Sequence, residues 1–433
     1  MDTELFQSII LKYQKGQGIG FTRRDLEIDF IPNMAIGIVG SRGCGKSFRT
    51  YQLTKELVDS IKSTNVCRIQ FNDHRILKTP ASELHVIDEA YYSLYPEKRY
   101  KEDVLFIFDE IHRIEGWEDY ILYLLEDPTH KVVIIDSTVN LLKGEFSSLL
   151  RGKVFTVEVH PFSFREFIRH YKIEEDWITS EGQSYLRNSF KKYLTQGGFP
   201  GLLDIPKKMH TELLKTYWDT MLLRDIIEAH SSEYINIATL RYFADSLISK
   251  LSCPMSVSKL SHHMKSQGFR FAKSALYDYL GYLADAFMVF TVDFYSKSEK
   301  VKARNHKKVY CIDWALAQAV CCAEGIDKTR ELENIVFIEL RRRGYDISYY
   351  KTKAGYEIDF VISGKDEKIE LVQVSYSLEK DEVREREIRA IVKSAKFLES
   401  KTVTIVTFNE KEIIEKDGLI IKVIPIWRWL LDY

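Results

Sequence analysis

The sequence lacks the features that identify several large classes of protein. Among its 433 residues only six are cysteine, and none stands in the paired spacing typical of a metal site. This scarcity predicts reduced thiols rather than a disulfide framework. No apolar run reaches membrane-spanning length, and residues 1–20 are too polar for a secretory signal. We therefore expect no membrane partner and a cytoplasmic location.

Charge excess and linkers are also missing. The 62 basic and 63 acidic residues nearly cancel, so any nucleic-acid surface must be local rather than global. With nine prolines, no internal repeat and no low-complexity tract, the domains are expected to pack closely. The length is nevertheless too great for one hydrophobic core and predicts two to four domains.

The most informative stretch that is present follows the apolar run 34–39. It matches G-x-x-x-x-G-K-[ST], the phosphate-binding P-loop, and precedes a helix-like segment, 48–61. The glycines let backbone N–H groups turn toward a polyphosphate, and the helix N-terminus adds a positive dipole end. Lys46 is predicted to reach the β- and γ-phosphates and Ser47 to hold Mg²⁺. The predicted nucleotide-binding residues are Gly40, Ser41, Arg42, Gly43, Cys44, Gly45, Lys46, Ser47 and Phe48. We also expect alkylation of Cys44 to block nucleotide binding.

A second motif supports this interpretation. The apolar run 104–108 has the length of a buried strand and ends in Asp109 and Glu110, as in a Walker B strand. Asp109 is predicted to bind the Mg²⁺ shell, and Glu110 to orient and deprotonate the attacking water. Phosphoryl transfer depends mainly on positioning and charge neutralisation, which these groups provide. A further strand is expected between the two motifs, at 66–71.

Another apolar run, 131–135, precedes a polar segment. Ser137, Thr138 and Asn140 are candidate sensors of the γ-phosphate, although these residue types are also favoured as helix caps. A strand at 154–159 completes the set. Strands that alternate with helices predict an α/β domain with a doubly wound parallel sheet.

Several motifs resemble an archaeal and bacterial ATPase family of the AAA-like superfamily. They are Phe108-Asp109-Glu110-Ile111-His112-Arg113-Ile114-Glu115-Gly116-Trp117, Leu150-Arg151-Gly152, Pro161-Phe162-Ser163-Phe164-Arg165-Glu166-Phe167, Gly197-Gly198-Phe199-Pro200 and Leu223-Arg224-Asp225-Ile226. The resemblance extends from about residue 21 onward. It implies an additional-strand P-loop ATPase core (1–160), a helical lid (161–235), a winged helix-turn-helix (236–325) and a PD-(D/E)XK nuclease-like, restriction-endonuclease-like α/β domain (326–433).

Three arginines in these motifs are candidates for catalytic or structural roles. Arg151 lies where such families place a charge near the nucleotide, and it is predicted to act as a finger or sensor, with Glu110 and Lys46 as the other catalytic residues. For Arg165 and Arg224, a structural ion pair is the favoured interpretation.

The third segment has two helix-like stretches, 256–267 and 272–286, separated by a turn at 268–269 and followed by strand-like runs at 287–294 and 308–312. This pattern is typical of a winged helix. Six basic residues around the turn between the strands are candidate DNA contacts: Lys297, Lys300, Lys302, Arg304, Lys307 and Lys308. The alternative is a solvated loop on a winged helix that packs against protein.

In the last segment Glu333 and Asp359 match two elements of the nuclease core, in which acidic groups assemble Mg²⁺ and activate water. The third element is missing, because Gln373-Val374-Ser375 stands where E-x-K belongs. We therefore treat Glu333, Asp359 and Gln373 as a degenerate nuclease site and expect a binding or docking module. The charge-dense run 379–389 is interpreted as a solvated helix face.

These patterns together predict an enzyme, a Mg²⁺-dependent ATPase that couples ATP binding and hydrolysis to DNA or to a protein partner. Adenine is preferred because no N-K-x-D guanine motif is present and because the family that the chain resembles is ATP-specific. Two alternatives stay open, an ATP-gated DNA nuclease and a nucleotide-controlled signalling or defence switch without turnover. A helicase is disfavoured by the single P-loop core unless the protein forms a ring, and a homo-oligomer is a possible partner.

Overall fold

The structure is a computed structural model of the whole chain, and it describes residues 3–16, 20–57, 62–77, 79–137, 150–228, 235–321, 327–364 and 368–432. These divide into two compact units, Met1–His160 and Pro161–Tyr433, which are described separately. In the described residues, no helix has both the length and the apolar character needed to cross a bilayer.

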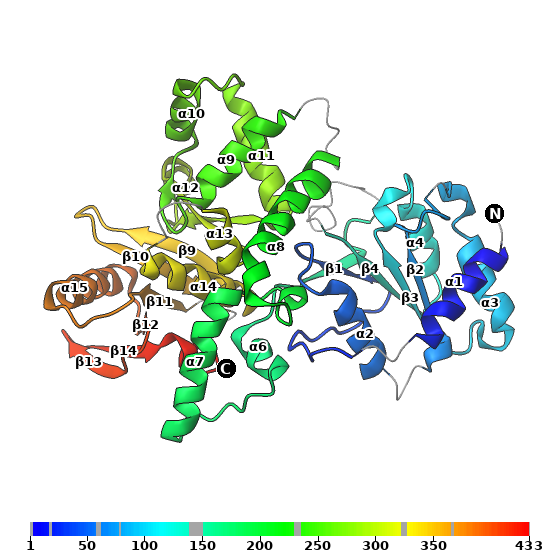
Figure 1. Cartoon of the computed structure of the whole chain (residues 1–433), viewed down its shortest axis with the longest axis horizontal. Coiled ribbons are helices and arrows are strands. Elements are labelled where there is room, and N and C mark those ends of the chain that lie inside the picture. The colour runs from blue at the N-terminus through cyan, green and yellow to red at the C-terminus, as the bar shows by residue number, and fades with distance from the viewer. Residues whose placement is uncertain are drawn as a thin grey trace. The chain divides into compact units, whose positions relative to one another are not determined.

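The first unit is built on a parallel sheet whose described strands run in the order β2-β3-β4-β1-β5 (Figure 1). Their bounds are β1 (Ala35–Val39), β2 (Val66–Gln70), β3 (Val104–Asp109), β4 (His130–Ile135) and β5 (Val154–Glu158). Strand β4 pairs with β1 on one side and with β3 on the other. An additional strand thus separates the P-loop strand from the Walker B strand, as predicted.

Both faces of this sheet are buried. The described helices of the unit are α1 (Thr3–Lys15), α2 (Lys46–Glu56), α3 (Val86–Leu94) and α4 (Glu118–Leu125). Along β3, Phe106 and Phe108 belong to one hydrophobic cluster, which also contains Phe6 of α1, while Leu105 and Ile107 belong to another. Alternate residues therefore enter opposite cores, which is why the strand sequence is continuously apolar rather than alternating.

The second unit begins with helices and continues into a large mixed sheet. Its described helices are α6 (Phe164–His170), α7 (Ser180–Gln196), α8 (Lys207–Thr220), α9 (Ile237–Ile248), α10 (Val257–Ser266), α11 (Lys273–Asp285), α12 (Glu299–Arg304), α13 (Trp314–Val320), α14 (Lys328–Arg342), α15 (Asp381–Leu398) and α16 (Ile426–Trp429), with a π-helical turn at Met221–Glu228. Its described strands are β6 (Pro254–Met255), β7 (Val289–Phe294), β8 (Lys307–Cys311), β9 (Asp346–Lys351), β10 (Glu357–Ser363), β11 (Ile369–Val374), β12 (Thr402–Thr407), β13 (Glu412–Lys416) and β14 (Leu419–Pro425).

One sheet runs through the whole of this set, in the order β13-β14-β12-β11-β10-β9-β7-β8-β6. Its continuity depends on β7, which pairs antiparallel with β8 and, at its end, parallel with β9. The expected boundary at residue 326 is therefore crossed by a shared sheet, because hydrogen bonds join strands from both sides of it. The segment between β7 and β8 is also not a simple turn, since it contains α12.

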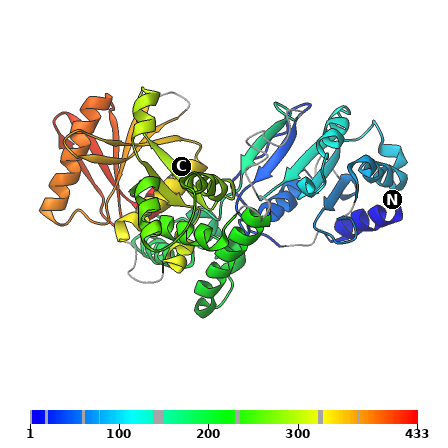
Figure 2. The same cartoon turned by 90° about the horizontal axis from the view of Figure 1, so that it is seen from above.

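Helices α14 and α15 both cover the C-terminal part of this sheet. On β10, Ile358 and Val361 share a core with Ala390 and Ile391 of α15. Phe360 instead stacks near Phe337 of α14, with ring centroids 6.5 Å apart. Figure 2 shows α15, in orange, lying against the last strands of the chain. The two helices thus contact different residues of one strand.

Candidate functional site

The P-loop closes tightly around the end of β1. A Cβ atom on Gly40 would lie 2.2 Å from the backbone oxygen of Val159, so only glycine fits there. Gly43 and Gly45 have φ values of 80° and 102°, the left-handed region that favours glycine. Gly45 then caps α2, whose first residues are Lys46 and Ser47. The motif thus forms the strand–loop–helix arrangement that the sequence predicts.

The groups inside this loop suit a polyphosphate and its cation. Lys46 Nζ donates to the backbone oxygens of Gly40 and Ser41, at 2.8 and 3.0 Å, so its charge already lies within the loop. The Ser41 hydroxyl is buried and has no hydrogen-bond partner among the described residues. Ser47 Oγ donates to Asp109 Oδ2 at 3.3 Å, which brings together two oxygen ligands of the kind Mg²⁺ prefers. The residues present therefore fit ATP and Mg²⁺.

Asp109 has two further partners on β2 that the sequence reading missed. Arg68 Nη2 and Gln70 Nε2 donate to its Oδ2 at 3.0 and 3.3 Å. Arg68 is buried, and its guanidinium also lies 4.9 Å from the ring centre of Tyr51. A charged residue in the middle of an apolar strand was the available signal. These contacts hold the carboxylate of Asp109 at the edge of the sheet.

Glu110 adopts an unusual backbone conformation for a residue with a side chain. Its φ is 58° and its ψ 36°, in the left-handed region. Its carboxylate accepts a hydrogen bond from Arg113 Nε at 2.6 Å. Strained conformations of this kind persist where the surrounding structure enforces them, often at functional sites. Glu110 N–H donates to Ile135 O on β4, which fixes the turn directly after the Walker B strand.

The turn that follows β3 contacts the residue after β4 through a histidine. His112 Nδ1 lies 2.8 Å from Asp136 Oδ2. Burial works against a charged imidazole here, but the hydrogen bond and the charge of Asp136 outweigh it and raise the pKa of His112. Ser137 is buried and follows Asp136 at this edge. The other two predicted sensors, Thr138 and Asn140, lie outside the described residues, so the sensor assignment stays a prediction.

Arg151 does not lie with this group in its own chain. It is exposed and precedes β5, and the nearby Lys153 O accepts a hydrogen bond from Ala35 N at the start of β1. The P-loop follows the other end of β1, roughly 15 Å away for a strand of this length. The structure therefore does not bring Arg151 to the P-loop of its own chain, and its role as a finger or sensor stays a prediction. The predicted ion pair of Arg165 is found with Glu175.

The side chain of Cys44 lies in the hydrophobic core next to the P-loop. Its side chain is fully buried and belongs to the core cluster of β1, β3 and β4 rather than pointing toward a ligand. Its backbone oxygen accepts a hydrogen bond from the buried Arg24 at 2.9 Å, and this bond helps to fix the loop conformation. Alkylation of this thiol would therefore require opening of the core, and its expected effect on nucleotide binding stays a prediction. Phe48 is 48% exposed.

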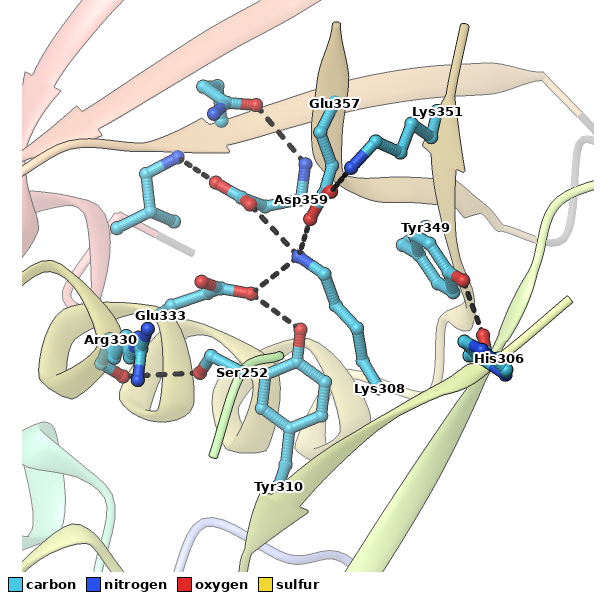
Figure 3. A network of polar contacts seen from close by, with 12 residues as sticks. Ser252, His306, Lys308, Tyr310, Arg330, Glu333, Tyr349, Lys351, Glu357 and Asp359 are labelled. Atoms are coloured by element: carbon cyan, nitrogen blue, oxygen red, sulfur yellow. Dashed lines mark hydrogen bonds and ion pairs between the residues drawn. The ribbon is translucent and has the colours of Figure 1, made fainter. Parts of the chain in front are cut away.

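A buried carboxylate cluster lies in the second unit, and a lysine occupies its centre (Figure 3). Lys308 Nζ lies 3.0 Å from Glu333 Oε1, 2.9 Å from Glu357 Oε1 and 3.1 Å from Asp359 Oδ1. Its side chain is 1% exposed, because β8 lies between β6 and β7. Tyr310 donates to Glu333 Oε1 at 2.7 Å. Lys308 is therefore a core residue, and its predicted contact with DNA is wrong.

The charges in this cluster adjust to one another. Burial disfavours the ammonium of Lys308, but the surrounding carboxylates outweigh it and raise its pKa well above the usual range. Burial, reinforced by the charge of Asp359, raises the pKa of Glu333 to about 8. Lys308 is thus the cation that compensates this group. Among the described residues no set of three or more histidine, cysteine or acidic side chains is arranged to hold a metal ion.

Of the three predicted nuclease residues, Glu333 and Asp359 both contact Lys308, whereas the side chain of Gln373 bonds to the backbone of Asp359 and to Glu387. Gln373 Oε1 accepts from the backbone N–H of Asp359, and its Nε2 donates to Glu387 of α15 at 2.8 Å. The pairing of β9 with β10 shifts register between Ile358 and Val361, a bulge that re-aims the side chains in between. Glu387 is buried, so part of the predicted solvated face belongs to the interior.

The remaining candidate DNA contacts are divided between paired and exposed side chains. Lys302 is paired with Glu299 and Lys307 with Asp293, both in partly exposed ion pairs. Three further basic residues of the set are exposed, as Lys307 is: Lys297, Lys300 and Arg304. The basic region is therefore smaller than its sequence suggests.

Comparisons with known families match the first unit to a described domain and the second unit to domains of unknown function. A sequence profile described as an AAA domain matches residues 32–168. Two profiles described as domains of unknown function, DUF8612 and DUF4143, match residues 187–329 and 328–429.

Two relatives cover nearly the whole chain, and both are uncharacterized proteins. One, from Methanocaldococcus jannaschii, is 30% identical and aligns over 99% of this chain and 96% of its own length. Another, from Haemophilus influenzae, is 28% identical over 91% of this chain and 94% of its own.

Solved structures show weaker likeness. A Walker-type ATPase of Pyrococcus abyssi matches with 12% identity and a TM-score of 0.42, over 74% of this chain and 95% of that one. DnaA from Aquifex aeolicus, bound to AMPPCP, matches with 13% identity and a TM-score of 0.24, over 64% and 86%.

Proposed function

This chain belongs to the family of the uncharacterized Methanocaldococcus jannaschii protein and contains a match to an AAA domain; from this premise we propose that its first unit binds ATP with Mg²⁺ and hydrolyses it. One observation carries the proposal. The P-loop, Asp109 and Glu110 follow β1 and β3, which run parallel with β4 between them, so all lie at the carboxyl edge of one sheet. Open α/β sheets bind their ligands at that edge.

Each residue has a role that follows from its chemistry. Lys46 binds and neutralises the terminal phosphates, together with the N–H groups of the loop. Ser47 and Asp109 hold Mg²⁺, which when bound supplies further neutralisation of phosphate charge. Glu110 orients and deprotonates the attacking water, which requires its carboxylate to leave Arg113. Because β4 ends beside both motifs, Ser137 is retained as a proposed sensor.

The second unit is proposed to be a module that engages DNA or a protein partner. A turn at Gly268, with φ 91°, joins α10 to α11, and antiparallel strands β7 and β8 follow. This order supports the predicted winged helix. The exposed Lys297, Lys300 and Arg304 support a local nucleic-acid contact.

An ATP-gated nuclease is the less favoured alternative. It would require Glu333 and Asp359 to bind Mg²⁺, but the ammonium of Lys308 already lies within 3.1 Å of both carboxylates. Release of that lysine would leave buried carboxylates without a counter-charge, which costs several kcal/mol. We therefore favour a fold that retains the acidic residues for structure.

The test measures ATP hydrolysis by the wild type and Glu110→Gln, with and without single-stranded, double-stranded and branched DNA. A positioned general base contributes about 100-fold or more, so the variant should lose at least that factor. Glu115→Gln removes an exposed charge from the same loop and serves as the matched control. Turnover that survives Glu110→Gln would overturn the hydrolysis mechanism. ATP binding without turnover by the wild type would favour the switch alternative.

A further inference from the structure

A basic and aromatic cleft in the second unit has no role in the proposed ATPase. It has a volume of about 860 Å³ and lies between the end of β7, α12, β9 and the end of α15. Three lysines line it, Lys297, Lys351 and Lys353, against a single acidic residue, Glu399. This imbalance is local, in a chain whose total charges nearly cancel, and it suits an anion.

Aromatic rings also line this cleft. Tyr350 and Phe397 stack with ring centroids 5.4 Å apart and planes 13° from parallel. The ring centroid of Phe294, on β7, lies 5.6 Å from that of Tyr350, on β9. Phe397 is 69% exposed although it is a large apolar side chain. One flat ring is thus held in place by another and remains accessible to a planar ligand.

We propose that this cleft binds single-stranded nucleic acid, with the lysines on the phosphates and Phe397 stacked on a base. Sequence-tolerant binding of single strands combines a positive groove with aromatic rings on which bases stack. In a duplex the base faces are covered by their neighbours, so the exposed ring favours a single strand. The inference rests on the proposed role of the second unit as a binding module, and it names the site and the ligand class.

The cleft adjoins the carboxylate cluster through a shared side chain. Lys351 Nζ lies 3.1 Å from Glu357 Oε2, while Glu357 Oε1 contacts Lys308 (Figure 3). A phosphate on Lys351 would therefore compete with Glu357 for that ammonium. Lys297 and Lys353 are exposed, and changes there avoid the buried cluster.

The experiment uses the full chain and a fluorescein-labelled oligothymidylate of about 20 nucleotides, followed by fluorescence anisotropy. The double variant Lys297→Glu/Lys353→Glu should weaken binding about tenfold or more. It should also reduce the steepness of the salt dependence, by about 0.7 in log–log slope for each lost phosphate contact. Lys191→Glu on α7, an exposed lysine elsewhere in the unit, is the matched control and should bind as the wild type does.

A second arm isolates stacking. Phe397→Ala should weaken binding of oligothymidylate about fivefold or more. An abasic oligonucleotide of equal length should bind the wild type with a similarly reduced affinity. Its affinity should not fall further with Phe397→Ala. Tyr185→Ala removes another exposed aromatic, 59% accessible on α7, and controls for general effects. Absence of oligothymidylate binding, equal binding by the cleft variants, or equal affinity for the abasic strand would each overturn the proposal. So would tighter binding of polyglutamate, the outcome expected of a site for acidic peptides.

Hydrolysis measured in the same preparations keeps the two proposals separate. Lys46→Ala should lose ATP hydrolysis and retain oligothymidylate binding, because the cleft contains no residue of the first unit. Loss of binding in the cleft variants, with ATP hydrolysis in the absence of DNA unchanged, supports the cleft. Binding that is unaffected by the cleft variants overturns it whether or not the protein is an ATPase.

Discussion

The two acidic sites of this protein use similar residues and differ in where the positive charge lies. At the end of β3, the carboxylate of Asp109 accepts hydrogen bonds from Ser47 and Arg68. Lys46 donates to a backbone oxygen of the P-loop. In the second unit, Lys308 stands at the meeting point of three carboxylates. In the first arrangement the cation of the protein, Arg68, contacts a single carboxylate oxygen, whereas in the second a buried lysine contacts three acidic residues at once. A set of acidic residues is therefore not enough to predict a metal site.

The largest expected effect comes from removing the internal cation. Lys308→Met leaves Glu357 and Asp359 without their counter-charge and should reduce the free energy of unfolding by about 3–5 kcal/mol. Lys307→Met, at the preceding residue, breaks only an exposed ion pair with Asp293. It should reduce the free energy of unfolding by less than about 1 kcal/mol. Urea denaturation of both variants measures the difference. Similar stabilities for the two would contradict the central place given to Lys308.

Matched aspartate substitutions should separate the two sites by function. Asp109→Asn removes a predicted Mg²⁺ ligand and should reduce ATP hydrolysis about 100-fold. Asp359→Asn should change ATP hydrolysis less than about twofold, because it lies in the other unit. Steady-state phosphate release measures both. Mg²⁺-dependent DNA cleavage by the wild type that disappears in Asp359→Asn would restore the nuclease alternative.

The cluster should also make stability depend on pH. With its pKa raised from 4.5 to about 8, Glu333 keeps in the folded protein a proton that the unfolded chain releases. The folded state then binds more protons than the unfolded state between these values, so its stability falls as the pH rises through this window. Glu333→Gln should remove this part of the decline and gain a few degrees in Tm over the wild type near pH 8.

The measurement is the melting temperature at several pH values between 5 and 8. The exposed Glu385→Gln on α15 removes an equal charge and should follow the wild-type profile. Parallel profiles for the wild type and Glu333→Gln would show that Glu333 is ionised in the folded protein throughout this range.

The smallest effect concerns the hydroxyl of Tyr310. Tyr310→Phe removes its hydrogen bond to Glu333 but keeps the ring, which stacks 4.3 Å from Phe337. One such bond contributes about 1 kcal/mol, so a loss of that size is expected in urea denaturation. A loss several times larger would indicate that the hydroxyl is needed to position the whole cluster.

Several elements of the second unit were predictable because their apolar runs are bounded by turn residues. The strands expected at 287–294 and 308–312 are β7 and β8, with bounds shifted by one or two residues, and the two helices expected at 256–267 and 272–286 are α10 and α11. Strand β13 escaped detection. Its residues Glu412–Lys416 are mostly exposed and polar at an edge of the sheet, so burial left no apolar signature.

The place of Lys308 was not predictable by the same means. In the sequence it ends a run rich in lysine and arginine, which resembles a solvated loop. Its burial arises because β8 is flanked by β6 and β7 and because α14 and β10 place acids opposite it. The bulge in β10 that re-aims Asp359 has no sequence signal of its own.

The sequence alone determined the candidate nucleotide site, because the P-loop is a local structure. Its glycines, Lys46 and Ser47 lie within eight consecutive residues, and a short strand, a loop and a helix N-terminus suffice to arrange them. Only the tertiary structure decided the character of the second acidic site. Lys308, Glu333 and Asp359 come from three separate elements, and whether their charges enclose a lysine or an open space depends on strand order and register. These depend on contacts between distant parts of the chain, which no local pattern records.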